Sequence, residues 1–341
     1  MTSPARRAVA IAAGLTVLAL VPVAAALVNQ PFYVDLFRRI LIFAIAAVSL
    51  DVILGYGGMV SFGHAAYLGV GAYAVGVLTH HGVHNGYVQW SFAIVVSALV
   101  ALAIGAVSVR TSGVYFIMIT LAFTQMLYYL GLSIEEYGGD DGMRLAARSQ
   151  FPGVIDLGNS TAFYYLVLAI LVAFLYVGHR LVEARFGMLV RAARSNESRA
   201  RAVGFSPYPY RLVAFVIAGA MCGVAGALLV NHTEYLTPEF MHWTRSGEIM
   251  FMVILGGMGT LVGPVLGAVV LLLLEDVLSA WTAHWQIVLG PVLVIAVLFA
   301  RRGLVGLLDG GARRIGGSAS DRGGEPNGGG ARRFGGTPPD A

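Results

Sequence analysis

The chain has 341 residues, of which 57% are hydrophobic and only 12% are charged. Soluble domains carry about 25% charged residues, so this composition excludes an ordinary soluble protein and indicates an integral membrane protein. The formal net charge is +4, but the arginines concentrate in loops and at the ends, where they orient a membrane protein, and nucleic-acid binding is not expected. The single cysteine, Cys222, excludes an intrachain disulfide and a CxxC redox or zinc site.

Apolar stretches near the length that crosses a membrane, about 20 residues, recur along the chain. The first follows Arg6 and Arg7 and is longer than the apolar core of a signal peptide, so we expect an uncleaved span. The sequence predicts an all-α polytopic membrane protein with about ten transmembrane segments. In chain order the predicted spans are Ala8–Val28, Ile40–Leu54, Gly58–Leu78, Trp90–Val109, Gly113–Leu132, Ala162–Val177, Leu212–Val230, Glu248–Met258, Leu261–Leu278 and Trp285–Ala300.

One of these segments, Glu248–Met258, is too short to cross a membrane by itself. The sequence GGMGTLVGP interrupts the chain between it and the next segment. We therefore expect a broken or re-entrant pair whose free backbone groups lie against protein.

The distribution of charge predicts that both termini face the cytoplasm. Short loops rich in arginine stay inside, which places the segment 180–211 there together with Arg110. Residues 133–161 carry five acidic residues and two arginines, a net charge of −3, and are expected outside. Arg38 and Arg39 also fall on the outer side, where we expect them to snorkel to the interface.

The most polar stretch between the spans runs from Arg180 to Arg211. It carries seven arginines and two acidic residues, a net charge of +5. Within it, residues 183–202 mix apolar side chains with arginines, which predicts one amphipathic helix that Gly204 ends in a left-handed C-cap. The alternative is an ordinary basic loop that only fixes orientation. The length of the stretch and its glycine and proline ending favour a folded loop that meets a soluble partner.

The segment Gly55–Gly76 is rich in glycine and alanine. Small residues allow helices to pack closely in lipid, which is one explanation. The other is that residues 55–58 unwind a helix beside a cavity and expose backbone groups to a substrate. Ser61 and His64 are spaced i, i+3 and are predicted to share a helix face there. Asp51 is the acidic residue that lies well inside the early spans.

Polar side chains also interrupt the predicted span Gly113–Leu132. Tyr115, Thr120, Thr124 and Gln125 either form interhelical hydrogen bonds or line the substrate route, and the sequence leaves both possibilities open. In the loop that follows the third predicted span, the three histidines of residues 80–84 have no cysteine or acidic neighbour, and a metal site is not expected there.

The sequence contains no motif of a known enzyme class. Lysine is absent from the chain, which excludes a standard P-loop of the form GxxxxGK[ST], and neither HExxH nor GxSxG occurs. We therefore predict that the protein is not an enzyme and that any ATP is hydrolysed by another subunit.

Three blocks of the sequence carry a family resemblance: LDVILGYGGMVSFGHAAYLGVGAYA from Leu50, RTSGVYFIMITLAF from Arg110, and FGMLVRAARSNESRARAVGFSPYPYRLVAFVIAGAMCGVAGAL from Phe186. Together, over roughly residues 35–300, they resemble the inner-membrane permeases of branched-chain amino acid (Liv-type) ABC transporters, in particular the LivM-type subunit. The resemblance implies a heteromeric importer with a second, LivH-type permease, two cytoplasmic ABC ATPases and a periplasmic or lipid-anchored substrate-binding protein. It implies no cofactor in this chain, because the partner ATPases bind the ATP.

The resemblance also implies which residues act. The cytoplasmic coupling helix that meets the ATPase would use Arg191, Arg194, Asn196, Glu197, Arg199, Arg201 and Gly204. The substrate path would be formed by Asp51, Tyr56, Gly58, Ser61, Gly63, His64, Tyr115 and Thr120. This chain departs from the family pattern at Asp51 and Met59, where the family usually has Asn and Gln. Arg199 and Arg201 stand where Ala and Glu are usual and predict a more acidic ATPase groove.

The sequence thus predicts a multi-pass permease of the inner membrane that forms half of a translocation path for leucine, isoleucine or valine. Alternatives are a similar permease for urea, short amides or aromatic acids, a self-sufficient secondary transporter or channel, and an intramembrane enzyme that uses His64 and Ser61. Residues 1–308 would form the permease domain in contact with lipid. The Gly- and Arg-rich tail, residues 309–341, would be disordered in the cytoplasm.

Overall fold

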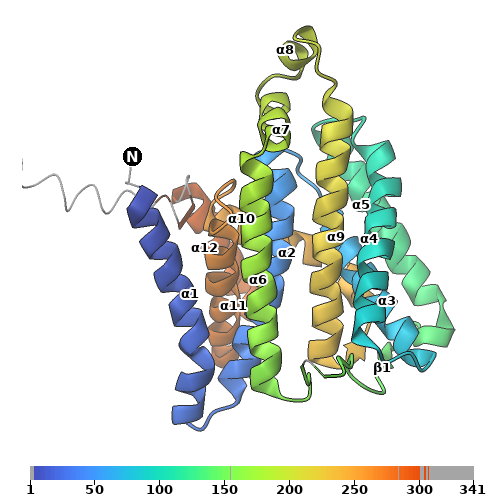
Figure 1. Ribbon diagram of the computed structural model, residues 1–341, viewed down its shortest axis with the longest axis vertical. Helices are drawn as coiled ribbons and strands as arrows, with labels where there is room; N and C mark the ends of the chain where they lie inside the picture. The colour runs from blue at the N-terminus through green and yellow to red at the C-terminus, as the bar shows by residue number, and fades with distance from the viewer. Residues whose placement is uncertain (1–3, 154, 283, 300–302, 305, 307–341) are drawn as a thin grey trace, which may run out of the picture.

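The computed structural model describes residues 4–153, 155–282, 284–299, 303–304 and 306. The predicted disordered tail lies outside these residues. The described residues form helices almost throughout (Figure 1). The α-helices are α1 Pro4–Leu27, α2 Phe32–Asp51, α3 His64–His80, α4 Gly86–Ser108, α5 Val114–Ser133, α6 Ser160–Glu183, α7 Arg185–Ser195, α8 Glu197–Ala202, α9 Pro207–Thr233, α10 Trp243–Gly256, α11 Gly263–Trp281 and α12 Trp285–Phe299. A π-helical turn, η1, covers Val52–Tyr56, and 3₁₀ turns cover η2 Glu135–Tyr137 and η3 Pro238–Met241. Two short strands, β1 Met143–Arg144 and β2 Tyr235–Leu236, pair antiparallel.

Among the described residues, five helices are long and apolar enough to cross a membrane, namely α4, α5, α6, α9 and α11. Shorter apolar helical stretches occur in α1, over Ala12–Leu27, and in α12, over Trp285–Val294. The prediction of an all-α polytopic membrane protein is confirmed at this level.

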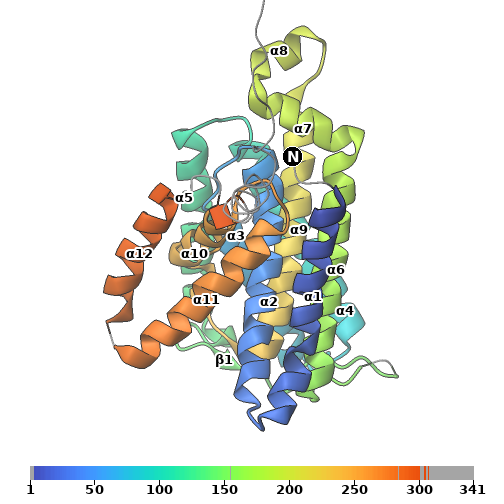
Figure 2. The ribbon, with the colours of Figure 1, turned by 90° about the vertical axis from the view of Figure 1, so that its left-hand side faces the viewer.

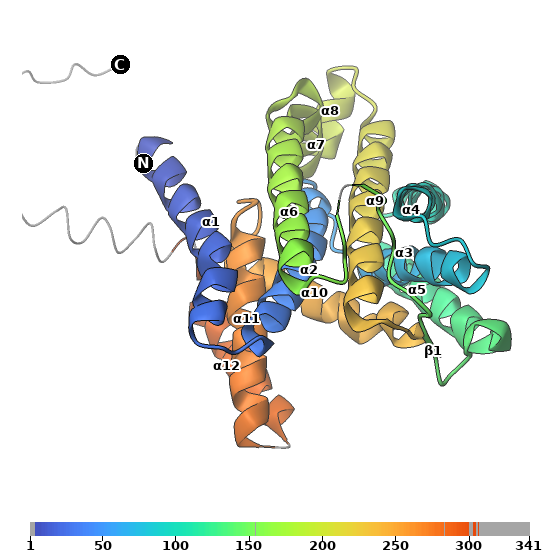
Figure 3. The ribbon, with the colours of Figure 1, turned by 60° about the horizontal axis from the view of Figure 1, so that its bottom comes forward.

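The helix α2 occupies the centre of the molecule and packs against α6, α9, α10 and α11. In Figure 3, α11 and α12 lie on one side with α1, while α3, α4 and α5 lie on the other side of α2, α6 and α9. The residues of α2 from Ile40 onward are buried on every face. A helix that is apolar all round and carries charges only near its ends is typical of such a central position.

The helix α2 begins eight residues before the predicted span Ile40–Leu54. These additional turns include Arg38, which the sequence suggested would reach the interface and which is buried instead. Arg38 is 2% exposed. It pairs with Asp35 at 2.5 Å, donates from Nε to Nδ1 of His232 at 2.9 Å, and lies over the Phe163 ring. The prediction that Arg38 snorkels to the interface is therefore wrong, since Asp35, His232 and the Phe163 ring hold the guanidinium inside the protein.

Close packing of α3 against α9 uses small residues. A side chain at Gly71 would collide with the carbonyl of Gly223, and one at Gly226 would collide with the carbonyl of Leu68. The glycine-rich character of α3 thus serves helix packing, which is the first of the two explanations that the sequence left open.

The two ends of the molecule differ. Figures 1 and 2 show α7 and α8 projecting beyond the other helices at one end, while β1 and the chain between α5 and α6 lie at the opposite end. The N-terminal end of α1 lies toward the α7 side and its C-terminal end toward the β1 side.

Candidate functional site

The first part of the candidate site is the break between α2 and α3. The π-helical turn η1 follows Asp51, and residues 57–63 have no helix or strand until α3 begins at His64. Gly58 has φ 68°, a conformation that favours glycine, and it is exposed. Tyr56 is half-buried at the end of η1. The chain unwinds where residues 55–58 predicted it, and the third predicted span starts as a helix six residues late.

Side chains from two neighbouring helices hold this break at Phe62. Thr120 Oγ1 of α5 accepts a hydrogen bond from Phe62 N at 3.2 Å, and Thr124 Oγ1 donates to Phe62 O at 3.0 Å. Ser246 Oγ of α10 donates to the same oxygen at 2.7 Å and accepts from Ala65 N at 2.9 Å. An unpaired backbone group inside a membrane costs several kcal/mol, so these side chains allow the helix to be interrupted there. Thr120 and Thr124 thus form hydrogen bonds between α5 and the non-helical segment 57–63.

The other residues predicted on the substrate path have different surroundings. Ser61 precedes α3 and its Oγ accepts from Gly63 N at 3.0 Å, so the prediction that Ser61 shares a helix face with His64 is wrong. His64 is buried, with its ring edge-on to Tyr67 at a centroid distance of 5.7 Å. Tyr115 is 77% exposed at the start of α5. The structure therefore brings Ser61, Gly63 and His64 together and leaves Tyr115 apart on the surface.

Asp51 connects this break to a second one between α10 and α11. Its carboxylate accepts hydrogen bonds from Gly259 N at 2.7 Å and from Leu261 N at 3.2 Å. Asp51 is 0% exposed, and the carboxylate compensates backbone donors that the interrupted helices leave free. The second break itself, residues 257–262, lies where the sequence predicted it. Its pairing with Asp51 was not predicted, because the partners are 208 positions apart and periodicity carries no information over that separation.

The polar loop reaches the first break through Arg194 of α7. The guanidinium of Arg194 donates from Nη1 to the carbonyl oxygen of Gly55 in η1. The stem of the same side chain lies beside Gly58, where a Cβ atom would be 2.8 Å from Arg194 Cγ. Arg191 ties α7 back to α6 through a hydrogen bond of 3.2 Å to Val182 O. The loop is thus in direct contact with an interrupted membrane helix.

The predicted single amphipathic helix over residues 183–202 is two helices, α7 and α8. Asn196 interrupts them with an extended backbone, φ −161° and ψ 105°, and its side-chain oxygen accepts from Arg199 N at 2.8 Å. Asparagine is a favoured N-cap because it satisfies a free donor of the first helical turn, so the capping preference of Asn196 overrides the continuous amphipathic pattern.

Glu197 holds α8 against the start of α9. It pairs with Arg201 at 2.5 Å and with Arg211 at 2.8 Å, and Arg211 also donates to Ala193 O of α7 at 3.1 Å. Partial burial by itself would raise the pKa of the Glu197 carboxyl. The hydrogen bonds and positive charges of Arg211 and Arg201 outweigh that effect and lower the pKa below its ordinary value. Glu197 is therefore ionised at neutral pH.

Gly204 ends α8 with φ 88°. Gly204 N donates to Arg201 O at 2.9 Å and Phe205 N donates to Ala200 O at 3.1 Å, which is the pattern of a Schellman cap. The predicted left-handed C-cap at this glycine is confirmed.

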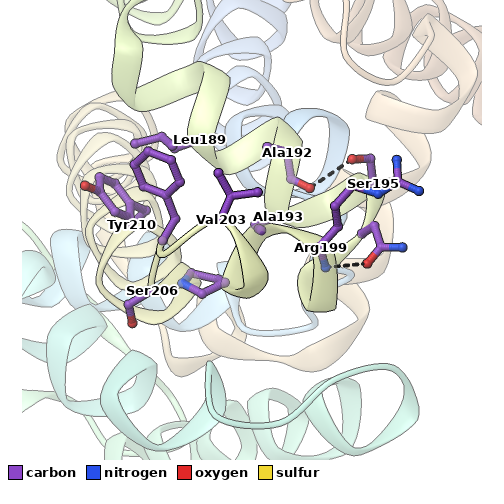
Figure 4. A pocket seen from close by; sticks show the side chains of 12 residues that line it. Leu189, Ala192, Ala193, Ser195, Arg199, Val203, Ser206 and Tyr210 are labelled. Atoms are coloured by element: carbon purple, nitrogen blue, oxygen red, sulfur yellow. Dashed lines mark hydrogen bonds between the residues drawn. The ribbon is translucent and has the colours of Figure 1, made fainter.

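A pocket of about 240 Å³ opens between α7, α8 and the start of α9 (Figure 4). Mostly apolar side chains line it, including Leu189, Val203 and Tyr210, which converge on it in Figure 4. Val203 and Phe205 are exposed large apolar residues at the projecting end of the molecule. Such a cavity beside arginines is a surface suited to a protein partner.

The comparisons with known proteins bear on this arrangement. A family model described as the permease component of the branched-chain amino acid transport system matches residues 32–298, from α2 into α12. The chain belongs to this permease family. The family and the apolar helices together make the permease a multi-pass protein of the inner membrane.

The permease is similar to several curated relatives. It is 28% identical to the high-affinity branched-chain amino acid transport system permease protein LivM of Salmonella typhimurium and 26% identical to LivM of Escherichia coli K12; each match covers 80% of this chain and 69% of the relative. It is 23% identical to the permease protein LivH of Escherichia coli K12 over 77% of this chain and 91% of LivH. No solved structure matches the permease. These findings do not favour the urea, amide, aromatic-acid or secondary-transporter alternatives.

Proposed function

We propose that this permease forms half of the translocation path of an ABC importer for branched-chain amino acids, and that partner ATPases drive it through α7 and α8. The observation that carries the proposal is the contact between Arg194 and the Gly55 carbonyl, because it joins the projecting loop to an interrupted helix. The names of the similar proteins LivM and LivH support the substrate class and a LivM-type role beside a LivH-type partner.

The proposed topology has ten membrane segments, α1 to α6 and α9 to α12, with α10 and α11 as a broken pair and both termini in the cytoplasm. The arrangement of the ends supports it. The basic segment that forms α7 and α8 lies at one end, on the side where α1 begins, and the acidic segment 133–161 lies at the other end with β1. Charge of this distribution orients membrane proteins with the arginines inside.

The ATPase is proposed to bind the surface formed by α7 and α8. The exposed Arg199 and Arg201 would meet acidic groups, and an apolar side chain of the ATPase would enter the pocket lined by Leu189, Val203 and Tyr210. Asn196, Glu197 and Gly204 would shape this surface through the cap, the ion pairs and the helix ending described above. ATP would be bound by the ATPases, and a substrate-binding protein would deliver the amino acid at the β1 end.

In the proposed mechanism, closure of the ATPase dimer pushes α7 and so displaces the Gly55 carbonyl. The segment 57–63 can bend because it lacks continuous helical hydrogen bonds. Asp51 then passes the movement to the break between α10 and α11, since its carboxylate bonds Gly259 and Leu261. The wall around Tyr56, Gly58, Ser61, Gly63, His64 and Thr120 would change shape as the path opens.

Reconstitution in proteoliposomes tests the proposal. The permease, a LivH-type partner, the two ATPases and a binding protein should together import leucine in an ATP-dependent manner. The permease alone should import none under a proton or sodium gradient. Gradient-driven uptake by the isolated chain, or no leucine uptake by the complete assembly, would contradict the proposed function.

A further inference from the structure

The first two turns of α10 carry a pair of opposite charges, Arg245 and Glu248, at the level of the middle of the apolar helix α5. Phe62 O accepts hydrogen bonds both from Thr124 of α5 and from Ser246 of α10, so these two side chains lie at one level. Thr124 is in the middle of the 20-residue α5, which is long and apolar enough to cross a membrane. At 1.5 Å per residue it lies roughly 15 Å from either end of that helix. Ser246 and its neighbours on α10 are therefore near mid-depth.

The two faces of α10 at this level are different. Ser246 is buried against the break of α3. Its neighbours Arg245 and Glu248 lie on another face, where their side chains are 29% and 39% exposed and pair with each other at 2.9 Å. Thr244 and Phe251 are also exposed. The spacing of 244, 248 and 251 is that of one helix face, so Thr244, Glu248 and Phe251 form an exposed face, with Arg245 beside it, that turns away from this protomer.

The half-exposed pair of Arg245 and Glu248 would be unfavourable against lipid tails at mid-depth. Ionisable residues inside membranes face a protein interior or a water-filled cavity, and pairing by itself does not remove the cost of lipid contact for half-exposed groups. The outward face of α10 must therefore turn toward an aqueous path or toward another protein. In an importer built from two permeases, the path between them satisfies this requirement.

Aromatic side chains fix the position of the pair. His242 lies against the ring of Tyr128 on α5 at a centroid distance of 5.1 Å, and its Nδ1 is 2.8 Å from Thr244 Oγ1. The start of α10 is thus anchored to α5. Trp243 is exposed and offers apolar surface beside the pair of Arg245 and Glu248.

We propose that Arg245 and Glu248 line the translocation path and bind the substrate as a zwitterion, an inference that rests on the proposed import function. The guanidinium of Arg245 matches a carboxylate with two parallel hydrogen bonds, and the carboxylate of Glu248 matches an ammonium group. An α-amino acid carries an ammonium group and a carboxylate group on the same carbon. Its binding therefore replaces the ion pair between Arg245 and Glu248 with two ion pairs between the protein and the substrate. A molecule with one charge leaves Arg245 or Glu248 unpaired. Trp243 and Phe251 would contact the branched apolar side chain.

The internal ion pair also limits how tightly the substrate is held. Binding must break the contact between Arg245 and Glu248, and release restores it, so the free energies partly cancel. Weak holding suits a path through which the amino acid must leave as readily as it enters.

A charge-neutral double variant, Arg245→Gln with Glu248→Gln, tests the inference without leaving an unpaired charge. In the complete reconstituted transporter it should lose leucine uptake by about tenfold or more while ATP hydrolysis continues. The matched control is Glu275→Gln, which removes one partner of the Arg39–Glu275 pair, 3.3 Å apart in the structure, and should keep uptake within about twofold. Wild-type uptake in the same preparation tests the proposed function separately.

Two results of this experiment would overturn the inference. One is leucine uptake by the double variant equal to that of the wild type. The other is a double variant that no longer assembles with the second permease, since the pair would then belong to a subunit interface.

Thiol labelling provides a second measurement that does not depend on transport. Thr244→Cys in a Cys222→Ala background should react with a charged thiol reagent in the assembled transporter, and saturating leucine should slow that reaction. The depth-matched control is Val95→Cys, because Val95 is 54% exposed near the middle of α4 and is expected to face lipid. No reaction at position 244, or equal reaction at 95, would overturn the inference.

Discussion

The two interrupted helices of this permease are stabilised in different ways. The break between α2 and α3 is held at Phe62 by hydroxyl groups of α5 and α10, and Arg194 of α7 contacts it from the projecting end of the molecule. The break between α10 and α11 is bound by the carboxylate of Asp51 from α2, and the hydroxyl of its own Thr260 also donates to Gly257 O and accepts from Gly263 N. The helix α7 therefore contacts the first break directly, whereas it reaches the second break only through α2 and Asp51. Four predictions test this difference.

The largest effect is expected at Asp51. Asp51→Ala leaves Gly259 N and Leu261 N without acceptors in a buried site, which should destabilise the permease by about 3 kcal/mol and greatly reduce the folded protein recovered from membranes. Asp51→Asn should be intermediate, because its single amide oxygen accepts one of the two hydrogen bonds. Thermal unfolding of the purified permease measures both. If Asp51→Ala were as stable as wild type, the carboxylate would not be what joins the two breaks.

A charge reversal at Arg194 should separate ATP hydrolysis from transport. Arg194→Glu replaces the donor to the Gly55 carbonyl with an acceptor, so leucine uptake should fall by about tenfold or more. The permease should still insert, because the residue lies outside the membrane helices. Uptake and ATP hydrolysis are measured together in proteoliposomes. Arg185→Glu, at the start of the same helix α7, is the control and should keep more of the uptake; equal loss in both would mean that only the charge of the loop matters.

Substitutions at two glycines with positive φ distinguish the effect of backbone strain from the effect of contact with Arg194. Gly58→Ala and Gly204→Ala each force alanine into a left-handed conformation, at a cost of about 1–2 kcal/mol. At Gly58 the new Cβ also meets Arg194, whereas at Gly204 it meets open space. Gly58→Ala should therefore lower leucine uptake per ATP hydrolysed more than Gly204→Ala does. Equal effects of the two substitutions would exclude a role for the Arg194 contact at the first break.

The smallest effect is expected from Glu197 of α8, at the projecting end of the molecule beyond the first break. Its folded pKa is lowered by Arg211 and Arg201, so the ion pairs stabilise α8 fully above the ordinary carboxyl pKa, and this contribution disappears as the pH falls through the lowered value. Because the group is partly exposed, less than about 1 kcal/mol is involved. The protection factors of the α8 amides, which are exchange rates corrected for the intrinsic pH dependence of exchange, should fall below about pH 4. Glu197→Gln should abolish this pH dependence, and its persistence there would assign it to another group.

Several features of the candidate site were predictable because they depend on local chemistry. Clustered glycines interrupt a helix wherever they stand, so residues 55–58 and the GGMG sequence marked both breaks. Gly204 ends a helix because glycine, which has no Cβ atom, adopts its φ of 88° without strain. Asn196 was recognised as part of the loop, but its capping role was missed because the amphipathic pattern runs through it.

The sequence by itself determined that the protein is a helical membrane protein, since low charge and long apolar runs leave no other stable arrangement in lipid. Its resemblance to the Liv-type permeases, carried by three sequence blocks, identified it as a permease. The sequence also marked the two glycine-rich breaks, between α2 and α3 and between α10 and α11. Only the tertiary structure decided that Asp51 binds the second break, that Arg38 is buried with His232, and that Ser246 of α10 meets Thr124 of α5 at the Phe62 carbonyl. These contacts join residues from separate helices, and the packing of those helices, rather than any local pattern, determines which polar groups find each other.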